Sequence, residues 1–118
     1  MNQNLEQVRA THALDRALNV RKQNGEGDCL SGYPSLIINN GLLATLAFSL
    51  DKEKQHARVA DAVAFHLHRL GTVPQTGNNG HPTAATLRDA LVKADSHVLR
   101  HATGEALAFL AYLKRFAK

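Results

Sequence analysis

The feature that most constrains the fold is one apolar stretch from Pro34 to Asp51, with the sequence PSLIINNGLLATLAFSLD. Its composition predicts a helix over 34–50, yet Asn39, Asn40 and Gly41 lie at its centre. Glycine inside a helix costs about 1 kcal/mol relative to alanine, and asparagine favours turns because its side chain competes for backbone hydrogen bonds. We therefore expect this helix to bend near Gly41, and expect either a close approach of another part of the backbone or a special contact at that position.

Hydrophobic residues repeat with a 3.6-residue period in the segments on either side. This pattern predicts a first helix over 3–23 and a third helix over 52–70, with Gly71 as the stop of the third. The expected buried face of the first helix consists of Ala10, Leu14, Ala17 and Leu18. The expected buried stripe of the third consists of Val59, Val63, Leu67 and Leu70.

The last third of the chain follows a loop rich in Gly, Asn and Pro at 71–82. Thr83 is expected to cap a fourth helix, whose inward residues are Leu87, Leu91 and Ala94. A last helix is predicted over 96–118, and Thr103 either interrupts it together with Gly104 or caps a separate final helix. Because no segment alternates with the period of a strand, the sequence predicts an all-α fold. The expected architecture is a compact single-domain bundle of five or six helices over 1–118.

Charge and cysteine content limit the class of protein. The net charge is +4 and the isoelectric point is about 9.6, which favours polyanionic partners. Residues 83–118 hold six basic and only three acidic side chains. A single cysteine, Cys29, excludes an intrachain disulfide and a thiolate metal cluster. The polar start of the chain and the absence of a run of about 20 apolar residues predict a cytoplasmic protein without a membrane segment.

The chain shows no pattern typical of an enzyme. His97 and His101 share a helix face at a spacing that suits a metal ion, but no HExxH motif or patterned carboxylates accompany them. We therefore interpret them as surface histidines. The nucleophile motif GxSxG and the phosphate-binding loop GxxxxGK[ST] are both absent. The sequence predicts no catalytic residue, no metal and no cofactor.

Basic residues are better organised than these groups. In the last helix, Lys114, Arg115 and Lys118 lie on a cationic face, with Arg100 in phase if the helix is straight. The opposite, apolar face carries Val98, Ala102, Ala106, Phe109, Leu110, Leu113 and Phe116. The cationic face either contacts a polyanion or is simply solvated.

Phe65 is the anomaly of the third helix, because it shares a face with Lys54, Arg58 and Arg69, away from the apolar stripe. An aromatic ring among cations suits nucleic-acid stacking or a protein interface. The alternative is a helix buried on two sides, with Phe65 in the core.

Two motifs resemble the small helical subunit of type III-B CRISPR (Cmr) effector complexes. The first is the P-x-L-I-x-x-N-G-L-x-x-x-L-A-F pattern, which runs here from Pro34 to Phe48. The second is the closing helix, TGEALAFLAYLKRFA, at 103–117. Arg9-Ala10 also resembles the usual start of the family. Two positions depart from its pattern: Tyr112 stands where Trp is common, and Tyr33 lies nearer the proline than the family's tyrosine does.

The resemblance implies a non-catalytic subunit, copies of which stack along an RNA-guided complex. Its partners would be other Cmr subunits, copies of itself, and the guide and target RNA. The residues expected to contact RNA are Arg58, Arg69, Lys114, Arg115 and Lys118, with Arg9 and Arg16 as weaker candidates. Phe65 would stack on the RNA or contact a neighbouring copy. The alternative is a stand-alone nucleic-acid-binding helical regulator, although the long 71–82 connection does not suit a helix-turn-helix.

Overall fold

A computed structural model describes residues 4–20, 29–52, 54–73 and 83–117. These residues form six α-helices and no strand, which confirms the predicted all-α fold. The helices are α1 (Leu5–Val20), α2 (Tyr33–Asn40), α3 (Leu42–Lys52), α4 (Lys54–Leu70), α5 (Ala84–Lys93) and α6 (Ser96–Phe116). The predicted helix at 21–23 and most of the predicted 71–82 loop lie outside the described residues.

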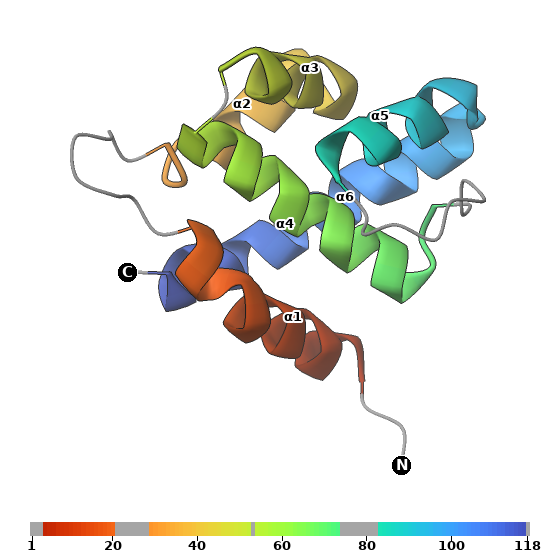
Figure 1. Cartoon of the computed structure of the whole chain (residues 1–118). Coiled ribbons are helices and arrows are strands. Elements are labelled where there is room, and N and C mark those ends of the chain that lie inside the picture. Colours follow the sequence, from red (N-terminus) through yellow and green to blue (C-terminus); the bar gives the residue numbers. More distant parts are fainter. Residues whose placement is uncertain (1–3, 21–28, 53, 74–82, 118) are drawn as a thin grey trace.

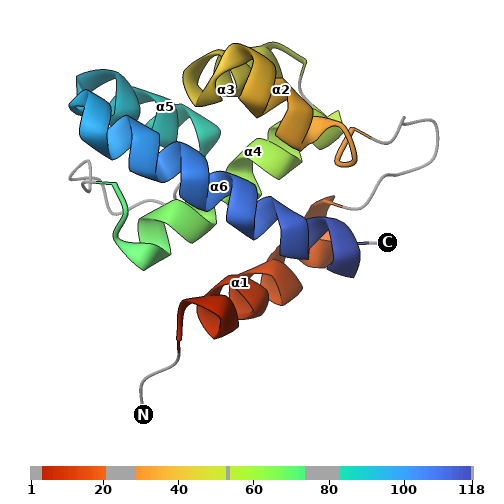
Figure 2. The ribbon, with the colours of Figure 1, turned by 180° about the vertical axis from the view of Figure 1, so that it is seen from behind.

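Helix α4 lies in the middle of the molecule and packs against α1, α3, α5 and α6. Figure 2, seen from behind, shows α6 crossing in front of α4. Helix α1 packs on both α4 and α6 at one end, while α2 and α3 lie at the other end (Figure 1). Three helices, α1, α4 and α6, therefore meet at the end of the molecule where the buried polar groups described below are found.

One apolar cluster contains residues from all six helices. Its largest fully buried side chains include Tyr33, Phe109, Ile37, Leu42 and Leu46, and alanines fill much of the space around them. The predicted stripe of α4 is confirmed at Val59, Val63 and Leu67. The single domain predicted for 1–118 stays a prediction, because that range extends beyond the described residues.

The predicted helix over 34–50 is two helices, separated at Gly41. The backbone of Gly41 has φ +92° and ψ 157°, a conformation open almost only to glycine. Its N–H donates to the carbonyl of Ile37, and its carbonyl accepts from the Thr45 hydroxyl at 2.8 Å, so the break is held on both sides. A Cβ at Gly41 would meet no atom within 4 Å. The expected close approach is therefore wrong, and the backbone angle explains the glycine.

Gly41→Ala should lower the free energy of unfolding by about 1–3 kcal/mol, the usual cost of forcing a side chain into this backbone region. Gly104→Ala is the matched control, because Gly104 lies inside α6 with open space around it. That substitution should raise stability by about 0.5–1 kcal/mol, since alanine favours helix. Urea unfolding followed by circular dichroism measures both changes, and a loss at Gly104 or none at Gly41 contradicts this account.

The predicted buried face of α1 is wrong at Leu14 and Leu18, whereas Ala17 is buried as predicted and Ala10 is half-buried. Leu14 and Leu18 are 63% and 76% exposed, whereas Ala13, Ala17 and Val20 are buried. The helix is turned so that His12 and Arg9 reach polar partners on α4 and α6. A hydrophobic pattern assumes that polar residues face water, and here two of them face inward.

The ends of the last two helices show which capping predictions hold. Thr83 caps α5 through a reciprocal capping box with Thr86, as predicted. Helix α6 begins after the N-cap Asp95 and runs without interruption, because the Thr103 hydroxyl donates to the carbonyl of Leu99 inside the helix. The predicted interruption or cap at Thr103 is wrong. Of the inward residues predicted for α5, Leu87 and Leu91 are buried and Ala94 is half-buried. On the apolar face of α6, Val98 is half-buried and Phe116 is partly exposed, and the remaining predicted residues are buried: Ala102, Ala106, Phe109, Leu110 and Leu113.

Candidate nucleic-acid interface

The ring of Phe65 is the centre of a cation cluster that joins α1 to α4. The guanidinium carbon of Arg16 lies 4.3 Å from the ring centroid, and that of Arg69 lies 5.4 Å away. The ring of His12 meets Phe65 edge-on, with centroids 5.4 Å apart. We call these four residues the Phe65 cluster. The ring is half-buried and already contacted by the chain's own cations, so the surface that this cluster offers is cationic rather than aromatic.

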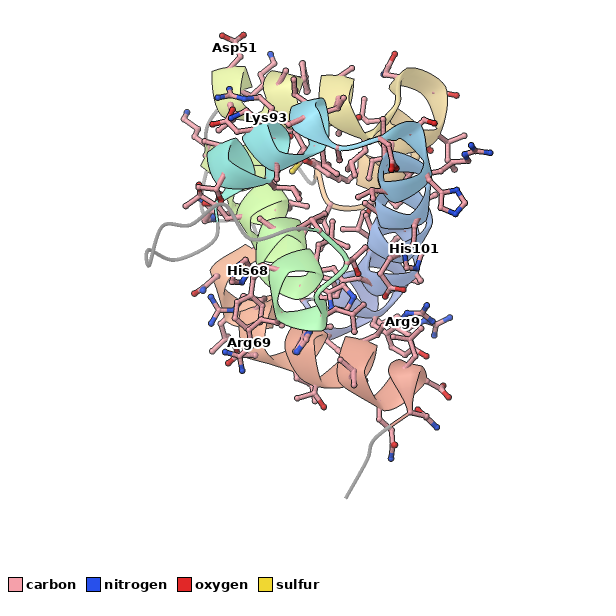
Figure 3. The ribbon with its side chains drawn as sticks, turned by 90° about the vertical axis from the view of Figure 1, so that its right-hand side faces the viewer. Arg9, Asp51, His68, Arg69, Lys93 and His101 are labelled. Atoms are coloured by element: carbon pink, nitrogen blue, oxygen red, sulfur yellow. The ribbon has the colours of Figure 1, made fainter. Side chains whose placement is uncertain are left out.

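The two arginines of the Phe65 cluster differ in their exposure. Arg69 is exposed at the end of α4, and in Figure 3 it lies beside α1. Arg16 is half-buried and donates two hydrogen bonds to the carboxylate of Asp15, at 2.9 and 3.2 Å. Arg69 is therefore better placed than Arg16 to meet a phosphate.

The cationic face predicted for the last helix is present on α6. Lys114 and Arg115 are exposed in its final turn, where positive charge also complements the negative end of the helix dipole. Because α6 is uninterrupted, Arg100 stays in phase with Lys114, and it too is exposed. Lys118 lies outside the described residues. Arg58, on α4, is half-buried.

Arg9 makes a different kind of contact from the one predicted. Its guanidinium forms two hydrogen bonds with Glu105, from Nε to Oε2 at 2.7 Å and from Nη2 to Oε1 at 2.8 Å. Glu105 lies on α6 with its side chain only 3% exposed. Two-point pairing of this kind fixes the geometry of both groups, and it holds α1 on α6. A phosphate would have to compete with that carboxylate for Arg9.

Behind Arg9, a chain of buried hydrogen bonds continues into α4 and back to α1. Nε2 of His66 lies 2.8 Å from Oε2 of Glu105, and Nδ1 of His66 lies 2.8 Å from Nδ1 of His12. The ring of His66 is fully buried and stacks on Phe109, with centroids 4.4 Å apart and planes 7° from parallel. We call Arg9, Glu105, His66 and His12 the buried polar chain.

Burial and hydrogen bonding together set the protonation of the buried polar chain. Desolvation lowers the pKa of His66, outweighing the hydrogen bond to Glu105, which acts to raise it. Desolvation, the proximity of His66 and the charge of Arg69 lower the pKa of His12. Desolvation acts to raise the pKa of Glu105, but hydrogen bonds from Arg9 and His66 together outweigh it, so that pKa is lowered. Near neutral pH, the chain therefore holds an ionised Glu105 and two neutral histidines.

Sequence reasoning misses the buried polar chain. Its partners are 39 to 96 residues apart along the chain, beyond the reach of spacing rules. The one available signal is Glu105, which lies one residue before Ala106 on the apolar side of a strongly amphipathic helix. A carboxylate on the buried side of a helix needs a cation or a hydrogen-bond donor beside it, and the hydrophobic pattern does not show which residue supplies that group.

The histidines considered for metal binding lie elsewhere. His97 and His101 are both exposed on α6, and Figure 3 shows His101 on the opposite side of the view from Arg69. Among the described residues, no group of three or more histidine, cysteine or acidic side chains is arranged to hold a metal ion. Likewise, none of the described helices is long and apolar enough to cross a membrane.

The fold and these contacts define a small, basic, all-helical protein, in which cations gather at the ends of α4 and α6 and the buried charges hold helices together. A model of the family of CRISPR-associated proteins called Cas_Cmr5 matches residues 5–118. The chain belongs to this Cmr5 family. Membership points to a subunit of a Cmr (type III-B) CRISPR complex.

Comparison with solved structures supports the fold. The X-ray crystal structure of a CRISPR-associated Cmr5 family protein from Thermus thermophilus superposes with a TM-score of 0.74 at 24% sequence identity. The alignment covers 98% of this chain and 96% of that one. No curated protein matches the chain.

Proposed function

We propose that the protein is a non-catalytic small subunit of a type III-B CRISPR ribonucleoprotein effector complex in antiviral defence. In this role, copies stack along the complex beside other Cmr subunits and help to bind the guide and target RNA. The observation that carries the proposal is the family match over 5–118. The exposed cations of α6 and the Phe65 cluster support the RNA-binding part, since phosphate contacts from Lys and Arg supply most non-specific affinity.

The predicted RNA contacts now divide into four groups. Lys114, Arg115 and Arg69 are exposed and are the proposed primary contacts. Arg16 and Arg58 are half-buried and are proposed as secondary contacts. Lys118 stays a prediction. Because Arg9 holds Glu105, we propose that it acts on the fold rather than on RNA.

The isolated protein should bind RNA weakly and without sequence preference, because one copy offers few phosphate contacts. Stacked copies multiply those contacts by raising the effective concentration of each one. A stand-alone regulator would instead bind a particular nucleic acid tightly by itself. No contact among the described residues favours that alternative, and binding of the isolated chain to random and specific sequences distinguishes the two.

Reversing the charge of Lys114 and Arg115 together, both to Glu, should weaken target-RNA binding by the assembled complex about tenfold or more at physiological salt. Affinity falls as salt rises, and each lost phosphate contact should make the slope of log affinity against log salt less steep by about 1. Titration of labelled target RNA at several salt concentrations measures both quantities. The isolated variant should stay folded, with a somewhat lower urea midpoint than the parent, because glutamates in the last turn of α6 oppose the helix dipole.

The matched control reverses Arg88 and Lys93 on α5, which changes the net charge equally. Arg88 already pairs with Asp89, and Lys93 lies exposed in the last turn of α5 (Figure 3). Equal losses in the two double variants would mean that only net charge matters. Unchanged binding by the α6 variant would mean that this face is solvated and that RNA lies elsewhere.

A further inference from the structure

The contact between Nδ1 of His12 and Nδ1 of His66 has room for one hydrogen. The two atoms are 2.8 Å apart, so one must donate and the other accept. His66 donates its Nε2–H to the ionised Glu105, which also accepts from Arg9. A neutral His66 then has a lone pair at Nδ1, and His12 must donate its own Nδ1–H. The hydrogen-bond chain therefore assigns one tautomer to each histidine.

One added proton fits this arrangement, and a second does not. A first proton on Nε2 of His12 leaves the Nδ1 contact unchanged. A second proton has only Nδ1 of His66 to occupy, where it would point directly at the Nδ1–H of His12. Two imidazolium rings would then also lie edge to face, with centroids only 5.0 Å apart. Both hydrogen-bond geometry and charge repulsion oppose that state.

The charged groups around the pair come from all three helices that meet there. On α1, Arg9 opposes protonation of His66, and Asp15 favours protonation of His12. On α4, Arg69 opposes protonation of His12. On α6, Glu105 favours protonation of His66, but its carboxylate is shared with the guanidinium of Arg9. The acidic groups therefore stabilise a single positive charge on the pair better than two.

This pair is one of several polar links that hold α1 on its neighbours, and the buried apolar side chains of α1 are small. The buried apolar side chains of α1 are Ala13, Ala17 and Val20, while its leucines face outward. Its other polar links to the described residues include the Arg9–Glu105 pair, the hydrogen bond from Tyr112 to Glu6 and that from Gln55 to the carbonyl of Val20. Small apolar side chains bury little area, so the polar links carry much of the attachment.

We propose that the His12–His66 pair acts as a pH-dependent latch between α1 and its neighbours. With at most one added proton, the pair holds α1 against α4 and α6, and when both histidines become protonated it releases α1. The released state exposes Ala13, Ala17 and Val20, and it separates Arg16 from Phe65 and Arg69. The latch belongs to the fold of the isolated chain and does not depend on the RNA-binding role proposed above.

Amide hydrogen exchange of the full-length protein at pH 7.5 and 5.5, corrected for intrinsic exchange rates, tests this proposal. Protection of α1 should fall relative to α6, by up to about tenfold per pH unit for each extra proton that the open state binds. His12→Asn should reduce this fall without abolishing it, because the asparagine amide can donate near the position of Nδ1 and does not titrate, whereas the buried His66 still gains a proton when α1 opens. His101→Asn, on the exposed face of α6, should behave as the parent.

Equal loss of protection in α1 and α6, unchanged protection of α1, or an unchanged pH response in His12→Asn would each overturn the latch. Nitrogen-15 spectra of the histidine rings in the parent give a second test that needs no variant. They should show His66 protonated at Nε2 and His12 at Nδ1 at pH 7.5. The opposite tautomers, or two imidazolium rings in a protein whose α1 is still protected, would also overturn the proposal.

Discussion

Glu105→Ala should lower the free energy of unfolding by about 3–5 kcal/mol, the range for breaking a buried ion pair on one side. The carboxylate accepts three hydrogen bonds, two from Arg9 and one from His66. Its loss leaves a partly buried guanidinium and a fully buried imidazole without their common partner. Because small domains are stable by only about 5–15 kcal/mol, this one change should remove a large part of the total.

Urea unfolding of the parent and the variant measures the loss, and Glu6→Ala provides the control. Glu6 also links α1 to α6, by accepting a hydrogen bond from the Tyr112 hydroxyl at 2.9 Å, but it is exposed. Its removal should cost about 1 kcal/mol or less. If Glu105→Ala costs no more than Glu6→Ala, the buried polar chain does not hold the helices together.

A double-mutant cycle isolates the interaction energy between Arg9 and Glu105 from the contacts that each residue makes elsewhere. Arg9→Met and Glu105→Ala should show a coupling energy of about 0.5–3 kcal/mol, since both residues belong to one hydrogen-bonded network. In the double variant, neither charge of the Arg9–Glu105 pair is left without its partner, so it should be less destabilised than the sum of the single changes. Strict additivity would contradict the direct contact between Arg9 and Glu105.

Most of the fold follows from local rules that the sequence displays. The cap at Thr83 and the stop at Gly71 depend on neighbours within a few residues and lie where the sequence predicts them, as does most of the stripe of α4. The prediction that Gly41 is special holds, but for a different physical reason. The sequence alone does not show whether a glycine is needed for a positive φ or because a neighbouring group lies close to it. The structure decides this at Gly41, because it shows open space beside the residue.

The face of α1 and its polar contacts depend instead on tertiary structure. Leu14 and Leu18 have the spacing of a core stripe, yet they lie outside because Arg9 and His12 find partners on other helices. Burying a polar side chain is favourable only when another group forms a hydrogen bond with it, and here that group is far away in the sequence. The cationic last turn of α6 does not depend on distant residues. It is predictable because the amphipathic spacing within that helix shows which of its sides is exposed.

Phe109→Ala should also cost about 3–5 kcal/mol, through the cavity that it leaves at the junction of the three helices. The ring is fully buried and stacks on His66, so the substitution removes core contacts and the flat surface that orients that imidazole. Phe116→Ala is the matched control on the same helix. Phe116 is 37% exposed, so its removal from the isolated chain should cost about 1–2 kcal/mol, less than the loss at Phe109.

The comparison between these two phenylalanines also bears on assembly. If copies stack through the end of α6, Phe116→Ala should weaken incorporation into the complex while leaving the isolated fold intact, whereas Phe109→Ala should impair both. Urea unfolding measures the first property, and the amount of the subunit in the purified complex measures the second. A large loss of stability in isolated Phe116→Ala would contradict the exposed position of that ring. Normal incorporation of the same variant would mean that the proposed stacking of copies does not use the end of α6.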